Sequence, residues 1–124
     1  MTNKETTTER RARVALAEQQ AQARWEAVKH QRLITALARA HDLGVSASVY
    51  HRHGNVVYYS FSICVDYSGT WTGTVAELSE HVMSGIESDL DGIAAEQARR
   101  RHLAQVKEDL IARLSNDERE ALGL

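Results

Sequence analysis

The feature that most constrains this chain is a long run, from Glu9 to Leu43, that contains neither glycine nor proline. The run is rich in Ala, Arg, Gln, Glu and Leu, which have high helix propensities. Thr6 and Glu9 have the spacing of a capping box, and Gly44 stands where a C-terminal cap belongs. The sequence therefore predicts one helix over residues 9–43, about 50 Å long at 1.5 Å per residue, after a polar tail over residues 1–8.

The apolar stripe of this predicted helix changes along its length. Its first half is thin and rich in alanine, and comprises Val14, Ala17, Ala21, Trp25 and Val28. From residue 33 onward the stripe shifts and widens. We therefore expect the second half to be buried against the body of the domain. The first half is expected to contact a partner helix, from the same chain or a second copy, through Val14, Ala21, Trp25 and Val28.

Residues 45–67 change to the two-residue period that is typical of β-strands. Apolar and polar side chains alternate on both sides of residues 53–55, which predicts an antiparallel hairpin. A three-residue loop keeps side chains of like character on the same face and places Tyr50 opposite Tyr58. A two-residue loop would mix the faces, so we predict the three-residue loop.

Residues 69–73 fit either a short third strand or a bend. Beyond them, Thr74 and Glu77 have the spacing of a capping box, which predicts that a second long helix begins there. Its apolar stripe continues to Leu114, although two glycines weaken it. The sequence therefore predicts either one helix over residues 75–114 or two helices that break near residues 88–92.

These elements, with a short terminal helix over residues 116–122, predict a single α+β domain of long helix, antiparallel hairpin and long helix. A two-stranded sheet is only marginally stable alone, so the helices are expected to cover its apolar face. Their distal halves, residues 9–28 and 95–114, are expected to pair antiparallel as a stalk. That pairing would close within one chain or between the two chains of a homodimer.

Composition and motifs limit the classes of function. A formal net charge of −2 argues against a general polyanion binder. The single cysteine, Cys64, excludes an internal disulfide and a four-cysteine zinc site, and it is read as a small buried side chain rather than a nucleophile. His51 and His53 offer two imidazoles, but the sequence indicates no third metal ligand. We therefore predict a protein without enzymatic activity, cofactor or metal.

The chain shows no apolar segment of the kind that marks a secretion signal or a membrane span. We expect a soluble, cytoplasmic protein that does not contact a membrane.

The polar face of the predicted hairpin is the strongest candidate for a functional surface. Tyrosine provides rigid amphipathic contact area, serine provides adaptable hydrogen bonds, and arginine is common at binding hot spots. The residues predicted to contact a partner are Ser48, Tyr50, Arg52, His53, Tyr58 and Ser60. The alternative interpretation of this face is a solvated sheet surface made of good strand formers.

The predicted function is a protein-binding module that occludes part of a host protein complex, in the manner of a phage or mobile-element inhibitor. The alternative is an accessory protein that contacts nucleic-acid phosphates through Arg10, Arg11 and Arg13 of the first helix. Acidic residues interspersed on that helix are more typical of a solvated surface. Four carboxylates of the second helix are read as a solvated face or as a docking surface for a basic partner: Glu80, Glu87, Asp89 and Asp91.

Overall fold

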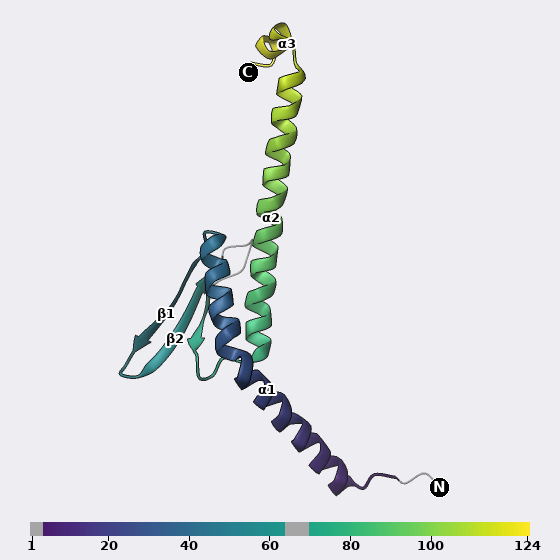
Figure 1. Cartoon of the computed structure of the whole chain (residues 1–124), viewed down its shortest axis with the longest axis vertical. Coiled ribbons are helices and arrows are strands. Elements are labelled where there is room, and N and C mark those ends of the chain that lie inside the picture. The colour runs from purple at the N-terminus through teal and green to yellow at the C-terminus, as the bar shows by residue number, and fades with distance from the viewer. Residues whose placement is uncertain (1–3, 64–69) are drawn as a thin grey trace.

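The computed structural model describes residues 4–63 and 70–124. Its elements are α1 (Thr7–Asp42), β1 (Ser46–Arg52), β2 (Val56–Ser62), β3 (Thr70–Thr74), α2 (Glu80–Arg113) and α3 (Asn116–Ala121). The strands form one antiparallel sheet in the order β1-β2-β3 (Figure 1). The predicted α+β class and the order of helix, sheet and helix are confirmed, and the third segment forms a strand rather than a bend.

α1 begins and ends close to where the sequence signals place it. The Thr6 hydroxyl accepts a hydrogen bond from the Glu9 N–H at 3.1 Å, and the Glu9 carboxylate accepts from the Thr6 N–H at 3.2 Å. At the other end Gly44 has a φ of 74°, and its N–H donates to the His41 carbonyl. Both predicted caps are therefore formed, and the helix begins two residues earlier than predicted, at Thr7.

The hairpin has the predicted three-residue loop. Tyr50 pairs with Tyr58, and Arg52 with Val56, so residues 53–55 form the connection. His53 and Gly54 adopt left-handed conformations with φ of 54° and 82°, which turn the chain tightly between the strands. Residues 64–67 of the predicted hairpin, including Cys64, lie outside the described residues.

The second long helix begins later than predicted. Thr74 ends β3, and its hydroxyl accepts from the Glu77 N–H at 3.3 Å at the turn over residues 75–77. Ser79 is the N-cap of α2, and its hydroxyl accepts from the Val82 N–H at 3.2 Å. The prediction that Thr74 caps the helix is wrong because pairing with β2 holds this residue in the sheet.

α2 is continuous as far as Arg113, so the break considered near residues 88–92 is absent. α3 follows as predicted. The Ser115 hydroxyl accepts from the Glu118 N–H at 3.2 Å, and the Glu118 carboxylate accepts from the Ser115 N–H at 3.1 Å. This capping box begins α3 as a helix separate from α2.

The core lies between one face of the sheet and the two helices. Its buried apolar side chains are Trp25, Leu33, Ala36, Ala40, Tyr59, Phe61, Ile63, Val75, Leu78, Met83, Ile86 and Leu90. The helical cover stops short of the hairpin tip. Val49, which alternation places on the covered face, is 40% exposed, because β1 is an edge strand and the helices bury mainly the central strand β2.

α1 and α2 run in the same direction where they pack together (Figure 1). Arg32 of α1 bonds Glu87 of α2, and Arg39, further along α1, bonds Asp91, further along α2. The direction follows from the topology. Three antiparallel strands separate the helices, and an odd number of reversing strands brings the chain into α2 in the direction in which it left α1.

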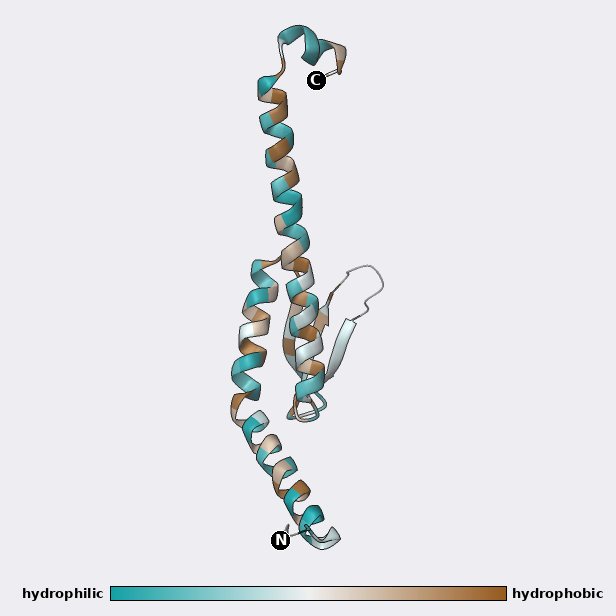
Figure 2. Ribbon diagram, turned by 90° about the vertical axis from the view of Figure 1, so that its right-hand side faces the viewer, coloured by the Kyte–Doolittle hydropathy of each residue, from teal (hydrophilic) through white to brown (hydrophobic). Residues whose placement is uncertain are grey.

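The distal parts of the two helices consequently project from opposite ends of the body (Figures 1 and 2). We call α1 residues 7–24 the N-terminal arm and α2 residues 98–113 the C-terminal arm. Every residue of the N-terminal arm is exposed. An antiparallel stalk cannot close within one chain, so this alternative of the stalk prediction is wrong. Pairing between chains stays a prediction.

Candidate functional site: the open face of the sheet

The sheet face opposite the core carries hydroxyl groups in three cross-strand rows. The rows are Ser46–Ser62–Thr70, Ser48–Ser60–Thr72 and Tyr50–Tyr58–Thr74. Neighbouring strands lie about 4.8 Å apart, so these side chains form a closely spaced array. The structure brings five of the six predicted contact residues onto this face, namely Ser48, Tyr50, Arg52, Tyr58 and Ser60.

Tyr50 and Tyr58 form a preorganised aromatic pair on this face. Their ring centroids lie 5.6 Å apart with an angle of 12° between the planes. Such cross-strand pairs stabilise a sheet by roughly 0.2–1 kcal/mol. Because each ring restricts the other, little side-chain freedom remains to be lost when a partner binds.

Arg52 and His53 mark the tip of the face. Both are exposed, and His53 belongs to the loop rather than to the array, so its position depends on the left-handed loop backbone. The third strand adds Thr70, Thr72 and Thr74 to the array. These hydroxyls were not predicted, because nothing in the sequence indicates which edge of the hairpin the third strand joins. Threonine at alternate positions was the available signal.

Trp25 does not belong to a partner surface. Its indole Nε1 donates to the Leu78 carbonyl at 2.9 Å, the Arg32 guanidinium lies 5.3 Å from its ring centroid, and only 4% of the residue is exposed. One helical turn away, the Lys29 ammonium donates to the Ala76 carbonyl at 3.0 Å. The prediction of Trp25 as an oligomer contact is wrong because the turn between β3 and α2 covers it within its own chain.

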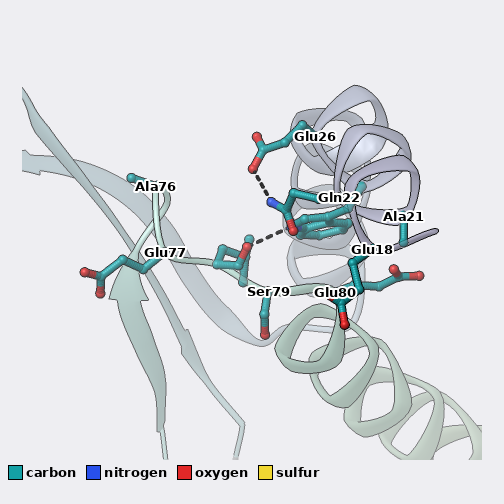
Figure 3. Close-up of a pocket in the computed structure, with 10 residues that line it drawn as sticks. Glu18, Ala21, Gln22, Glu26, Ala76, Glu77, Ser79 and Glu80 are labelled. Atoms are coloured by element: carbon teal, nitrogen blue, oxygen red, sulfur yellow. Dashed lines mark hydrogen bonds between the residues drawn. The ribbon is translucent and has the colours of Figure 1, made fainter. Parts of the chain in front are cut away.

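The other predicted oligomer contacts, Val14, Ala21 and Val28, are exposed. Ala21 lines a shallow groove between the N-terminal arm, the turn after β3 and the start of α2 at Glu80 (Figure 3). Glu80 also lies beside Ala21 and Val28 in an adjoining groove. The exposed stripe of the arm therefore begins where the cover provided by α2 ends.

The arginines of the alternative nucleic-acid surface lie in the first turns of α1. Arg13 is held by the Glu5 carboxylate at 2.8 and 3.2 Å, a hydrogen bond that raises the pKa of the guanidinium. Arg10 and Arg11 are exposed neighbours that point in different directions around the helix. On α2, Arg99 and Arg100 similarly share the carboxylate of Glu96. Acidic neighbours thus offset part of the positive charge on both helices.

Four carboxylates in the first half of α2, those of Glu80, Glu87, Asp89 and Asp91, connect this helix to the rest of the protein. Their partners are Arg32 for Glu80 and Glu87, Arg39 for Asp91, and the Trp71 indole, at 2.8 Å, for Asp89. The hydrogen bond with Glu87 is also the main reason that the pKa of Arg32 is raised. These acidic groups hold α2 against α1 and β3, a role that their sequence pattern alone did not indicate.

Across residues 4–63 and 70–124, no group of three or more His, Cys, Asp or Glu side chains is placed to hold a metal ion. No helix in this part of the chain is both long enough and apolar enough to cross a membrane. No family model matches the chain, and neither does any curated protein or solved structure.

Proposed function

We propose that this protein is a non-enzymatic protein-binding module whose recognition surface is the open face of the sheet. The observation that carries the proposal is the stacked, solvent-accessible Tyr50–Tyr58 pair within a regular array of hydroxyl groups. Tyrosines at the centre of an interface are frequent binding hot spots. The surrounding hydroxyls both donate and accept hydrogen bonds, so they can satisfy the polar rim of a partner.

The shape of the molecule supports an occluding mode of action. The recognition face occupies one side of a small body, and long helical arms extend from both ends of that body (Figure 1). When a partner binds at the face, the arms would shield a much larger part of its surface from other proteins than the contact itself covers. An inhibitor encoded by a phage or mobile element would act in this way in the cytoplasm. Both the source of the protein and its location remain predictions.

The partner can be identified by site-specific crosslinking. A photoreactive residue at Ser60 should capture one defined protein in a lysate of cells that carry the gene. The same photoreactive amino acid placed at Ile34, an exposed position on α1, should not capture that protein. Identification of the captured protein then permits affinity measurements with purified components.

Tyr58→Ala should weaken binding of that partner by about 30-fold, the effect of losing a hot spot of about 2 kcal/mol. Tyr58→Phe, which keeps the stacked ring, should lose less. Ile34→Ala serves as the matched control and should bind like the wild type. Thermal unfolding of each variant separates lost binding from lost folding. Wild-type affinity in a folded Tyr58→Ala protein would disprove the proposal.

The nucleic-acid alternative predicts a different pattern. Phosphate contacts release counterions, so binding would fall steeply as salt rises. Replacing Arg10, Arg11 and Arg13 by alanine would then remove binding, whereas Tyr58→Ala would not. A protein interface centred on tyrosine depends much less on ionic strength.

A further inference from the structure

We propose that copies of this chain associate head to tail, with the C-terminal arm of one copy packed on the N-terminal arm of the next. The two arms would run parallel. The inference does not depend on the proposed recognition function, because it concerns surfaces at the two ends of the molecule rather than the face of the sheet.

Both arms carry apolar stripes that residues 4–63 and 70–124 of their own chain leave exposed (Figure 2). On the C-terminal arm, Leu103, Val106 and Leu110 are 49%, 39% and 56% exposed. On the N-terminal arm the stripe contains Val14, which is exposed, together with exposed alanines. Isolated helices of this length are marginally stable in water, because helices are stabilised mainly by packing of an apolar face. Each arm therefore needs a partner.

The stripes of the two arms have the same spacing. Val14, Ala17 and Ala21 are separated by three and then four residues, and so are Leu103, Val106 and Leu110. Four residues further along stand Leu114 and Trp25; the chain's own turn after β3 covers Trp25, so the proposed pairing ends at Ala21 and Leu110. Parallel pairing therefore stacks Val14 on Leu103, Ala17 on Val106 and Ala21 on Leu110. Over one span of seven residues such a stripe drifts by only about 20° around a straight helix, so the two stripes can face each other without strong supercoiling.

The two arms also match in length and in side-chain size. The N-terminal arm is roughly 27 Å long and the C-terminal arm roughly 24 Å at 1.5 Å per residue. The small alanines of one arm lie opposite larger side chains of the other, which allows close approach of the helices and interdigitated packing. Pairing of two N-terminal arms would bring alanine against alanine and bury less apolar surface.

The position of α2 decides whether the two arms can pair parallel or antiparallel. Ala21, Val28, Arg32 and Arg39 lie on one side of α1, since they are separated by seven, four and seven residues. In the body this side is occupied by α2, which bonds Arg32 and Arg39. An antiparallel C-terminal arm would carry the rest of its own helix into that occupied space. A parallel C-terminal arm approaches from the N-terminal end of α1 and ends beside Glu80, where α2 begins.

Contacts of this kind join two different surfaces of the chain. Any assembly therefore keeps a free N-terminal arm at one end and a free C-terminal arm at the other, and each can bind a further copy. The wild-type protein should therefore form species larger than a dimer, with a mean mass that rises with concentration. Multi-angle light scattering over a concentration series measures this mass against the 13.9 kDa of one chain.

Two blocked variants test the pairing. Ala17→Glu disables the N-terminal arm and Val106→Glu disables the C-terminal arm; both positions are exposed within their helices. Each variant alone should be monomeric. An equimolar mixture should form a complex of twice the chain mass and no larger, because each variant retains the one intact arm that the other lacks.

The controls place the same charge on the other side of each arm. Leu16→Glu and Arg101→Glu, both at exposed positions, should assemble like the wild type, and circular dichroism verifies that all variants fold. Association of Ala17→Glu alone would show that two C-terminal arms pair with each other. Association of Val106→Glu alone would show pairing of N-terminal arms. Association of either variant alone overturns the proposal. So does a wild type that is monomeric at all concentrations, or a mixture of the two variants that remains monomeric.

Discussion

At the scale of single residues, two glycines of α2 show how context changes the effect of one residue type. A Cβ at Gly85 would lie 2.8 Å from a ring carbon of Trp71, whereas a Cβ at Gly92 would meet no atom of the described residues within 4 Å. The close approach of Trp71 also lets its indole reach Asp89 at 2.8 Å. Gly85 thus joins β3 to α2, although in sequence both glycines only weaken the predicted helix.

Alanine should therefore have opposite effects at these two positions. Gly85→Ala should lower the free energy of unfolding by about 1–3 kcal/mol, because Trp71 must shift from a packed position. Gly92→Ala should raise it by about 1 kcal/mol, the difference in helix propensity. Urea unfolding of both variants measures the two changes. Equal stabilisation by both substitutions would show that Trp71 does not pack against Gly85.

At the scale of elements, ion pairs support α2 where it leaves the body and the C-terminal arm begins. The Glu96 carboxylate accepts hydrogen bonds from Arg99 at 3.0 and 2.7 Å and from Arg100 at 3.2 Å. The hydrogen bonds with Arg99 are the largest cause that lowers the pKa of Glu96, to about 2. These contacts are solvent-exposed, so they support the helix locally and contribute little to the stability of the whole fold.

The lowered pKa of Glu96 fixes the direction of its pH dependence. Its contribution is fully present above the unfolded pKa, about 4.3, and is lost as the pH falls through the folded pKa of about 2. Arg99→Ala should move the pKa of Glu96 back toward its ordinary value, whereas Arg113→Ala, further along α2, should leave it unchanged. Carboxyl chemical shifts followed by NMR during an acid titration measure both. An unchanged midpoint in Arg99→Ala would contradict the assignment.

At the scale of the whole molecule, the direction of the helices sets the shape. α1 and α2 pack side by side only in the body, and their arms lead away from it at opposite ends (Figure 1). The arms lack the buried apolar contacts that hold the body together. They are therefore available for contacts between copies, while the body keeps the sheet and its open face in place.

Small-angle X-ray scattering tests this extended shape. A compact chain of this length has a radius of gyration of about 14 Å. The blocked variant Val106→Glu, measured as a monomer, should exceed that value clearly, with a long tail in its distance distribution. A radius near the compact value would mean that the arms fold back on the body.

Local chemistry was enough to predict much of the fold. The capping boxes at Thr6 and Ser115 and the left-handed cap at Gly44 each depend on residues a few positions apart. The hairpin register followed from alternation, because only an odd loop keeps Tyr50 and Tyr58 on the same face. The same alternation placed five of the predicted contact residues on one face, since all of them belong to the two strands of one hairpin.

The rest depended on how distant segments meet. Pairing of β3 with β2 determined the direction of α2 and held Thr74 in the sheet, so that Ser79 caps the helix instead. The turn after β3 then covered Trp25, and α1 gained arginine partners for the carboxylates of α2. A third strand reverses the chain once more than a hairpin does. That single reversal separates the two arms, and a local sequence pattern cannot indicate it because pairing between strands is a long-range interaction.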